Sequence, residues 1–204
     1  MTLIMASIIY TYNGGVYVNI TNKCPCRCLF CIRANGDGLG SADSLWHTKE
    51  PTEKEIIDAI AEFDFSPFKE IVFCGYGEPF YAFDKLLAAC KYIKENLDIK
   101  VRINTNGLGN LINGFETAEK IAPYIDSISI SLNAPTPELY KRVTQPVYDG
   151  ETAFNAMLDF AKRCKMLVPD VTLTVVDVIH KEDIELCQKL CDEIGIPLRV
   201  RQYD

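Results

Sequence analysis

Short β-rich runs that alternate with longer helical patterns are the feature of this sequence that most limits its fold. The runs "IIYTY" and "VYVNI" flank Asn13-Gly14-Gly15, a motif that favours a tight hairpin turn. Further strands are predicted at 70–75, 100–104, 127–132, 171–179 and 197–203. Helices are predicted from near Thr52, where Glu55 completes a capping-box pattern, and at 83–96, 116–121, 151–165 and 182–194. Strands and helices in this order predict a parallel sheet with right-handed crossovers.

The number of these repeats narrows the choice of α/β architecture. Counting "VYVNI", six strands alternate with helices, which is too few for the closed barrel of eight. We therefore expect a partial (β/α)6 barrel with an N-terminal β-hairpin, and a doubly wound sheet is the alternative. The 204 residues fit a single domain over 1–204.

Polar or glycine-rich motifs follow four consecutive predicted strands. A cysteine cluster follows the first strand, "GYGEP" the second, "TNG" the third and "NAP" the fourth. Each motif is a weak signal alone, because glycine, proline and asparagine are common in turns. The carboxyl ends of parallel strands lie at one edge of a sheet, so we expect the four motifs to meet there.

Four of the nine cysteines lie within eight residues, "CPCRCLFC". The odd total and the tight spacing argue against a disulfide framework and favour metal binding or redox chemistry. Cys24, Cys28 and Cys31 have the spacing C-x3-C-x2-C. A cubane 4Fe–4S cluster usually takes one thiolate per iron, so three cysteines would leave one iron open to a further ligand, as in catalytic metal sites. Cys26 is expected to be a non-ligand; as a fourth ligand it would close the site around zinc or a structural cluster.

The motifs together resemble one known superfamily. The pattern C-x3-C-x-aromatic-C, with Phe30 before the last cysteine, resembles the radical S-adenosylmethionine (SAM) superfamily. "CGYGEP" is similar to the Gly-Gly-Glu-Pro motif that follows the second strand in that superfamily, with Tyr76 between the two glycines. "NTNG" and "SLNAP" resemble its third- and fourth-strand elements. The "YNGG" hairpin and the block "NITNKCPCRCLFCIR" resemble, more specifically, the TatD-associated radical SAM proteins.

The resemblance implies a mechanism and a set of binding residues. Cys24, Cys28 and Cys31 would hold three irons of a 4Fe–4S cluster, and the amino and carboxylate groups of SAM would chelate the fourth. One electron then splits the sulfonium into methionine and a 5′-deoxyadenosyl radical, which abstracts hydrogen from a substrate. Glu78 would pair with the ammonium of SAM, and the glycines before it would let the backbone approach the bound amino acid. The residues implied to bind SAM are Phe30, Gly75, Tyr76, Gly77, Glu78, Asn104, Asn106, Ser131 and Asn133.

Three arginines are candidates for binding the substrate. Arg33 follows the cysteines, and Arg199 and Arg201 alternate on the last predicted strand, so the latter two point to one face. If that face lines the barrel, the charges need a partner, and an anionic substrate such as a carboxylate or phosphate would supply it. A polar, exposed edge strand is an equal alternative.

Charge and hydropathy restrict the partners and the compartment. The net charge of −7 argues against general nucleic-acid binding. No run reaches the roughly 18–20 apolar residues that span a bilayer, and the first residues lack a basic signal-peptide region. A cytoplasmic protein without membrane association is therefore expected. The resemblance implies an electron donor such as flavodoxin or ferredoxin, and a second copy of the chain, in a homodimer, is a candidate for closing the open side of the barrel.

Several functions stay open from the sequence alone. The resemblance favours a radical SAM enzyme with an unidentified substrate, which is either a small molecule, as for deazapurine-forming relatives, or a protein, as for glycyl-radical activases. A non-catalytic metal-binding or electron-transfer module is the alternative from another class. Such a module would not respond to SAM.

Overall fold

Within residues 6–203, the part of the chain that the computed structural model describes, a seven-stranded sheet forms the centre of the protein. The strand order follows the chain from β1 to β7. β1 and β2 are antiparallel, as the hairpin motif predicts, and every later pair is parallel. The strands are β1 (Ile9–Tyr12), β2 (Gly15–Val18), β3 (Glu70–Phe73), β4 (Lys100–Thr105), β5 (Ser127–Ser131), β6 (Asp170–Val176) and β7 (Leu198–Arg201).

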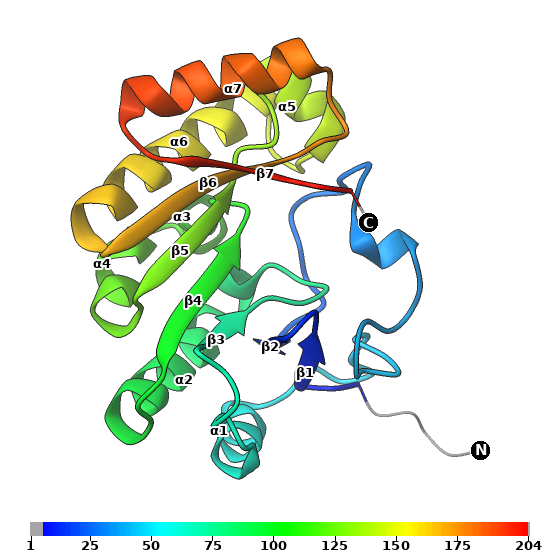
Figure 1. The fold of residues 1–204 in the computed structure, drawn as a ribbon, viewed down its shortest axis with the longest axis vertical. Coiled ribbons are helices and arrows are strands. Elements are labelled where there is room, and N and C mark those ends of the chain that lie inside the picture. Colours follow the sequence, from blue (N-terminus) through cyan, green and yellow to red (C-terminus); the bar gives the residue numbers. More distant parts are fainter. Residues whose placement is uncertain (1–5, 204) are drawn as a thin grey trace.

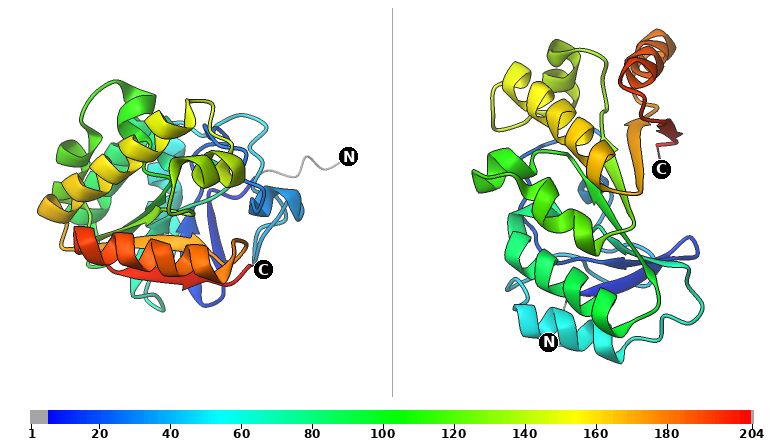
Figure 2. Two further views of the ribbon diagram at one scale, coloured as in Figure 1. Left: turned by 90° about the horizontal axis from the view of Figure 1, so that it is seen from above. Right: turned by 90° about the vertical axis from the view of Figure 1, so that its left-hand side faces the viewer.

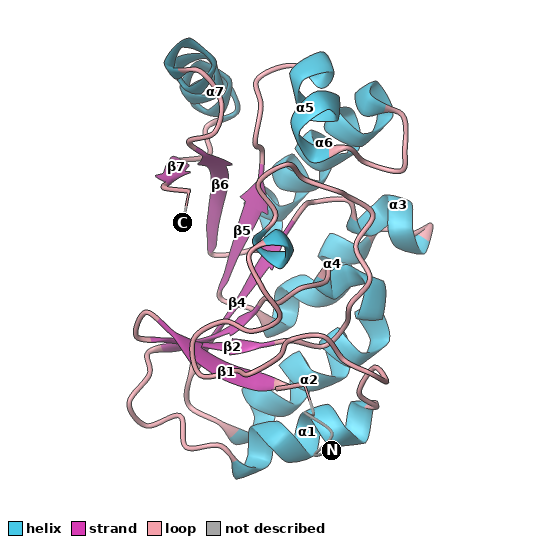
Figure 3. Cartoon of the chain, turned by 90° about the vertical axis from the view of Figure 1, so that its right-hand side faces the viewer, coloured by secondary structure: helices cyan, strands magenta, loops and turns pink. Residues whose placement is uncertain are grey.

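Helices connect the parallel strands and lie along the convex side of the curved sheet (Figure 1, Figure 3). β1 and β7 form the two edges of the sheet, which does not close on itself (Figure 2). No helix within residues 6–203 is long and apolar enough to cross a membrane. The α-helices are α1 (Glu53–Glu62), α2 (Phe83–Asn96), α3 (Gly109–Asn113), α4 (Thr117–Ile121), α5 (Pro137–Thr144), α6 (Gly150–Leu167) and α7 (Lys181–Ile194), and the 3-10 turns are η1 (Ile32–Ala34), η2 (Pro79–Ala82) and η3 (Ala122–Tyr124).

The two faces of the sheet differ in polarity, because successive side chains of a strand point to opposite sides. The parallel registers place buried aliphatic residues next to one another on the face that the helices cover. This convex face includes Val16, Ile71, Ile103, Ile128 and Leu173, each at most 1% exposed. The alternate positions form a polar concave face that includes Glu70, Arg102, Ser129, Thr172 and Arg199. The concave face is therefore the surface that is free to hold a ligand.

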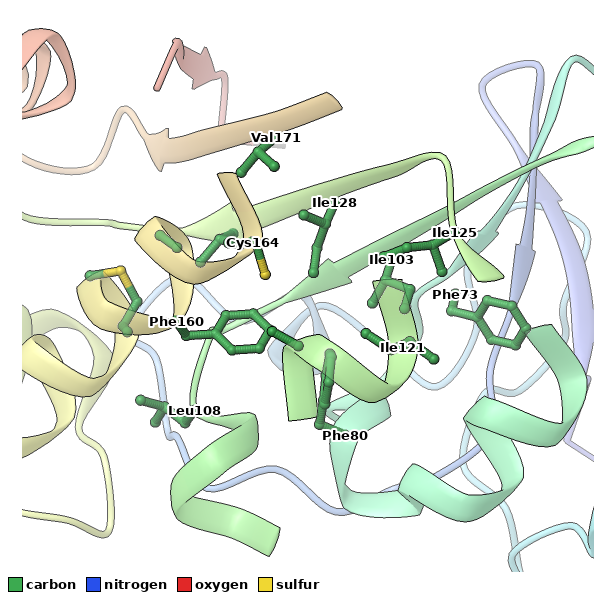
Figure 4. Close-up of a cluster of buried hydrophobic side chains, with 14 of the residues drawn as sticks. Phe73, Phe80, Ile103, Leu108, Ile121, Ile125, Ile128, Phe160, Cys164 and Val171 are labelled. Carbon is green, nitrogen blue, oxygen red and sulfur yellow. The ribbon is translucent and has the colours of Figure 1, made fainter. Parts of the chain in front are cut away.

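Aromatic rings fill the space between the sheet and its helices. Phe80 and Phe160 meet edge-to-face with ring centroids 5.4 Å apart, and both are fully buried. Figure 4 shows these rings beside Ile103 and Ile128 from the strands. Edge-to-face contact places the positive edge of one ring against the negative face of the other, so this pair fixes both η2 and α6 on the sheet.

The predicted partial barrel with an N-terminal hairpin is confirmed, and the sheet stays open. The doubly wound alternative is wrong, because the sequential strand order contains no reversal. The predicted capping box is present at the start of α1. Thr52 Oγ1 accepts a hydrogen bond from the Glu55 N–H at 3.2 Å, and Glu55 Oε2 accepts one from the Thr52 N–H at 2.7 Å.

The sequence prediction missed two helices and extended several strands too far, namely β2, β3, β6 and β7. α3 and α5 have no predicted counterpart, and β6 ends at Val176, before a turn, rather than at 179. α5 does carry start signals, since the Thr136 side chain accepts a hydrogen bond from Leu139 N–H and Pro137 occupies the first turn. Its eight residues are too few for the helical period to stand out.

Replacing the buried ring of Phe160 tests the importance of this core. Phe160→Ala should lower the free energy of unfolding by about 3–5 kcal/mol, because it removes the edge-to-face contact and leaves a cavity. Phe115→Ala is the matched control, since Phe115 is 38% exposed. Urea unfolding followed by circular dichroism measures both. Equal losses in the two variants would contradict the assignment of Phe160 to the core.

Candidate functional site

The cysteine loop, residues 24–31, follows β2 at the carboxyl end of the parallel strands. Backbone hydrogen bonds attach it to the segment at the end of α5. The Leu29 N–H donates to the Val143 carbonyl oxygen at 2.9 Å, and the Val147 N–H donates to the Pro25 carbonyl oxygen at 2.8 Å. The loop therefore has a fixed path that does not depend on its thiols.

The four thiols of this loop have different environments. Cys24, Cys28 and Cys31 are half-buried, whereas Cys26 is only 2% exposed. Asn106 Nδ2 lies 3.9 Å from the sulfurs of both Cys24 and Cys26. A hydrogen bond from the Cys26 thiol lowers the pKa of Cys24, and the same contact raises the pKa of Cys26. Burial therefore separates Cys26 from the three half-buried thiols, whose role as cluster ligands stays a prediction.

Arg33 is held by the cysteine loop itself. Its Nε donates to the Cys31 sulfur at 3.3 Å, and its Nη2 donates to the Cys26 carbonyl oxygen at 3.3 Å. The guanidinium also lies over the ring of Trp46, 5.7 Å from the centroid. These contacts give Arg33 a structural role around the cysteines, and its predicted contact with a substrate stays a prediction.

Glu78 is a buried carboxylate at the junction of three loops. It is 4% exposed, and its Oε1 accepts a hydrogen bond from the Thr105 hydroxyl at 2.7 Å. Its Oε2 accepts one from the Asn106 N–H at 2.7 Å, and its own N–H donates to the Lys23 carbonyl oxygen at 2.7 Å. Burial raises the pKa of Glu78 to about 8. "GYGEP", "TNG" and the start of the cysteine loop therefore meet, as their positions after the strands predict.

Gly75, Tyr76 and Gly77, the residues before Glu78, pack against other loops at this junction rather than lining an open surface. A Cβ atom on Gly75 would lie 2.1 Å from Asn19 Oδ1, and one on Gly77 would lie 2.2 Å from the Thr21 carbonyl oxygen. Both glycines thus allow a close approach to the chain that follows β2, whereas the sequence predicted an approach to the bound amino acid. The Tyr76 hydroxyl donates to the Gly36 carbonyl oxygen at 2.6 Å. Tyr76 therefore holds in place the glycine-rich loop that contains Gly36. Contacts of SAM with Gly75, Tyr76 and Gly77 stay predictions.

The other predicted SAM-binding residues lie near the carboxyl ends of β4 and β5 or in the cysteine loop. Asn104 and Ser131 are half-buried on β4 and β5, and Phe30 is half-buried against the core. Asn133 is 4% exposed, adopts a left-handed φ of 60°, and its Oδ1 has no hydrogen-bond partner within residues 6–203. A buried polar atom without a partner is costly, so this amide is suited to a ligand that donates a hydrogen bond.

The last strand places its two arginines on the concave face at the edge of the sheet. Arg199 and Arg201 are both exposed, so they are not buried charges, and Arg199 Nη2 lies 3.4 Å from the Ser129 hydroxyl. Arg102 lies on the same face and pairs with Glu70 at 2.8 Å. The two sequence alternatives thus each hold in part: β7 is an exposed edge strand, and its arginines point into the open barrel. A pocket of about 180 Å³ on this face is lined by Glu70, Arg102, Ser127, Ile128, Ser129, Asp170, Thr172 and Arg199.

Sequence reasoning missed three residues that shape the site. Arg102 alternates with Asn104 on β4, and this alternation was the available signal. Asn19 and Asn22 are the two asparagines of the block "NITN". They hold the segment that follows the glycine-rich loop, through Leu45 and His47. Asn19 Nδ2 donates to the Leu45 carbonyl oxygen at 2.8 Å, and Asn22 donates to and accepts from the His47 backbone. Their spacing was visible in the sequence, but their partners lie more than 20 residues away.

The donor set of the cysteine loop fits an iron–sulfur cluster with one open iron. Three half-buried thiols come from one loop, and the Asn133 oxygen without a partner follows β5 at the same carboxyl end of the sheet. Across the described residues, no group of three or more His, Cys, Asp or Glu side chains is arranged to hold a single metal ion. A cubane differs from such a site because it spreads its thiolates over separate irons.

Comparisons with known proteins place this site in a family. The family model of the radical SAM superfamily matches residues 18–194. A probable GTP 3′,8-cyclase of Methanocaldococcus jannaschii is 30% identical over 198 residues, which cover 91% of this chain and 57% of the relative. A probable GTP 3′,8-cyclase of Methanosarcina acetivorans is 29% identical over 132 residues, 64% of this chain and 36% of the relative. The chain thus spans little more than half of the first relative.

Solved structures agree with the fold. Streptococcus suis SuiB bound to S-adenosylmethionine superposes with a TM-score of 0.65 at 21% identity, over 92% of this chain and 38% of that one. Native anSMEcpe with bound AdoMet superposes with a TM-score of 0.63 at 18% identity, over 92% of this chain and 50% of that one. The match over residues 18–194 covers most of the chain, so it belongs to the radical SAM superfamily, whose enzymes use a 4Fe–4S cluster and SAM.

Proposed function

We propose that this enzyme holds its cluster through Cys24, Cys28 and Cys31 and acts on an anionic small molecule bound on the concave face of the open barrel. When bound, the cluster and SAM supply the chemistry: one electron splits the sulfonium, and the resulting 5′-deoxyadenosyl radical abstracts hydrogen from the substrate. The observation that carries the proposal is the position of three half-buried thiols at the carboxyl end of a sheet whose concave face is polar.

The chain's own residues would position the cofactor. Asn106 contacts the cysteines and Glu78 lies behind it, so the "TNG" and "GYGEP" turns are candidates for the amino-acid part of SAM. A carboxylate has about four acceptor sites. On Glu78, three of these sites accept hydrogen bonds within the protein. One site is left for the SAM ammonium. Asn133, with its unpartnered Oδ1, is a candidate for a hydroxyl or ammonium donor of the same ligand.

Arg199 and Arg201 would bind an anionic group of the substrate. Partial burial lowers the pKa of Arg199, and the like charges of Arg102 and Arg201 on the same face lower it further. Glu70 already pairs with Arg102, so the two arginines of β7 carry the charge that a ligand would neutralise. This arrangement favours a small molecule over a protein substrate, because the charges line the inside of the barrel rather than a flat outer surface.

GTP is the specific candidate for that small molecule. The relative that covers 91% of this chain is a probable GTP 3′,8-cyclase, and a nucleoside triphosphate matches the arginines of β7 in charge. Activation of a glycyl-radical protein is the remaining alternative. The family assignment sets aside the non-catalytic module. Finer membership in the TatD-associated family, a cytoplasmic location, a flavodoxin or ferredoxin donor and a homodimer stay part of this proposal.

Formation of 5′-deoxyadenosine tests the proposed chemistry. The anaerobically reconstituted protein should release it from SAM after reduction with dithionite, and GTP should stimulate this release. Deuterium at C3′ of GTP should appear in the 5′-deoxyadenosine. Arg199→Ala and Arg201→Ala should each lower the stimulation about tenfold, since each removes a charged hydrogen bond. Liquid chromatography with mass spectrometry measures the product. If GTP does not change the release of 5′-deoxyadenosine, GTP is excluded as the substrate. If the reconstituted protein releases no 5′-deoxyadenosine, the proposed function is refuted.

Single cysteine variants test the ligand assignment. Cys24→Ala, Cys28→Ala and Cys31→Ala should each lose the cluster, because each removes the thiolate of one iron. Cys26→Ala should keep about four irons per chain. Iron and sulfide titration after reconstitution measures the content. A loss in Cys26→Ala equal to that in the other three would indicate a closed site with four protein ligands.

Glu78→Gln tests the predicted pairing with SAM. The substitution removes the charge but keeps the size, so SAM affinity should fall about 10- to 100-fold while the cluster stays. Thr105→Val is the control, since it removes a hydrogen bond to Glu78 without changing charge. Isothermal titration calorimetry with SAM, alongside iron analysis, measures both variants. Unchanged affinity in Glu78→Gln would remove Glu78 from the SAM site.

A further inference from the structure

Tyr140 carries a buried hydroxyl that lacks a hydrogen-bond partner. The residue lies on α5 and is 1% exposed, and its Oη has no partner within residues 6–203. Its ring packs edge-to-face against Phe154 of α6, with the ring centroids 5.6 Å apart, so the ring is fixed away from solvent. A buried polar group without a partner costs free energy. The hydroxyl is therefore suited to an acceptor that forms only when a ligand is bound.

Backbone hydrogen bonds place the face of α5 that carries Tyr140 beside Cys28. Residues three and four apart lie on one face of a helix, so Tyr140 shares its face with Val143 and Thr144. The carbonyl oxygens of Val143 and Thr144 accept hydrogen bonds, at 2.9 and 3.0 Å, from the backbone N–H groups of the two residues that flank Cys28. The proposed cluster ligand Cys28 is therefore held against the turn of α5 that follows Tyr140.

The electrostatics of the hydroxyl agree with this position. Burial raises the pKa of Tyr140, and the thiols of Cys26 and Cys28 are the next largest causes. Thr144 lowers the same pKa, but its hydroxyl donates to the Tyr140 carbonyl oxygen at 2.8 Å, and these two described side chains are not hydrogen-bonded to each other. The sulfurs of Cys26 and Cys28 are therefore the acceptors available to the Tyr140 hydroxyl.

The two sulfurs differ as acceptors once a cluster is bound. A thiol sulfur accepts hydrogen bonds weakly, and Cys26 is the cysteine that the proposed function leaves without iron. A thiolate carries negative charge, and a hydrogen bond to a charged acceptor is roughly twice as strong as one to a neutral acceptor. Cys28 is therefore the stronger acceptor in the loaded enzyme.

We propose that the Tyr140 hydroxyl donates a hydrogen bond to the thiolate of Cys28 when the cluster is bound, and that this bond makes the cluster easier to reduce. The inference rests on the proposed function, which assigns Cys28 to the cluster. The proton stays on Tyr140, and no covalent bond changes. A donor to a ligand sulfur withdraws negative charge from the cluster, so it favours the reduced state, which carries one more electron. Tyr140 would thus set part of the reduction potential from within the protein core.

The reduction potential of the reconstituted cluster tests the proposal, and it is measured without SAM or substrate. Tyr140→Phe removes only the hydroxyl. The ratio of reduced to oxidised cluster at a fixed potential should fall about tenfold, which lowers the midpoint by about 59 mV for one electron. A redox titration followed by electron paramagnetic resonance measures this shift. In deuterium oxide, the pulsed form of the same method should detect an exchangeable deuteron beside the wild-type cluster that Tyr140→Phe lacks.

Tyr10→Phe is the matched control. Tyr10 is 2% exposed, and its hydroxyl donates to the Cys74 carbonyl oxygen at 3.3 Å, so the same substitution removes a hydrogen bond within the protein. Tyr10→Phe should lower the melting temperature of the cluster-free protein and leave the reduction potential unchanged. Tyr140→Phe should show the opposite pattern, because its hydroxyl gains a partner only when the cluster binds.

A double variant separates the two possible acceptors. Tyr140→Phe should still lower the potential in the Cys26→Ala background, because the proposed acceptor is Cys28. If the effect of Tyr140→Phe disappears in that background, Cys26 is the acceptor and the assignment to Cys28 is overturned.

Two further results would overturn the proposal. One is an equal potential in Tyr140→Phe and the wild type. The other is a loss of cluster-free stability in Tyr140→Phe equal to that in Tyr10→Phe, which would identify a partner within the protein, such as Thr144. If Tyr140→Phe takes up less iron while its cluster-free stability is unchanged, the hydroxyl contacts the cluster and the proposal is supported. Wild-type protein that assembles no cluster would refute the proposed function, and this inference with it.

Discussion

The buried carboxylate of Glu78 is the interaction on which the site depends. It accepts hydrogen bonds from the Thr105 hydroxyl and the Asn106 N–H, while its own N–H donates to the carbonyl oxygen of Lys23. These bonds join the ends of β2, β3 and β4, the three strands whose loops surround the cysteines. Loss of the carboxylate would leave the Thr105 hydroxyl and the Asn106 and Phe80 N–H groups without this acceptor, a cost that falls on the turns after β3 and β4.

The glycines of "GYGEP" follow from the same junction. Any side chain at Gly75 or Gly77 would overlap Asn19 or the backbone of Thr21. Both glycines are therefore required because the turn after β3 packs closely on the chain after β2. Only from that close position can Glu78 reach the turn after β4. The sequence indicated the need for small residues here, but the atom they approach was visible only in the structure, because it lies more than 50 residues away in the chain.

The parts of the fold that could be predicted are those with a strong local period. Short β-rich runs predicted the strands, and the capping box of Thr52 and Glu55 predicted the start of α1 to within one residue. α5 escaped prediction because its eight residues hold barely two turns, although it positions the cysteine loop through Val143. The site motifs were likewise predicted to converge, because the ends of parallel strands share one edge. Their hydrogen-bond partners depend on tertiary packing, which no local pattern encodes.

The raised pKa of Glu78 connects cofactor binding to the order of these loops. Burial disfavours the charged carboxylate and raises its pKa to about 8, although three donors favour the ionised form. An ammonium group beside it, as proposed for SAM, would lower this pKa, and the ionised carboxylate would then accept the same bonds more strongly. Because those bonds join the turns after β3 and β4, a ligand that ionises Glu78 also stabilises the arrangement of these two turns. Cofactor affinity and loop order are therefore two measures of one electrostatic interaction.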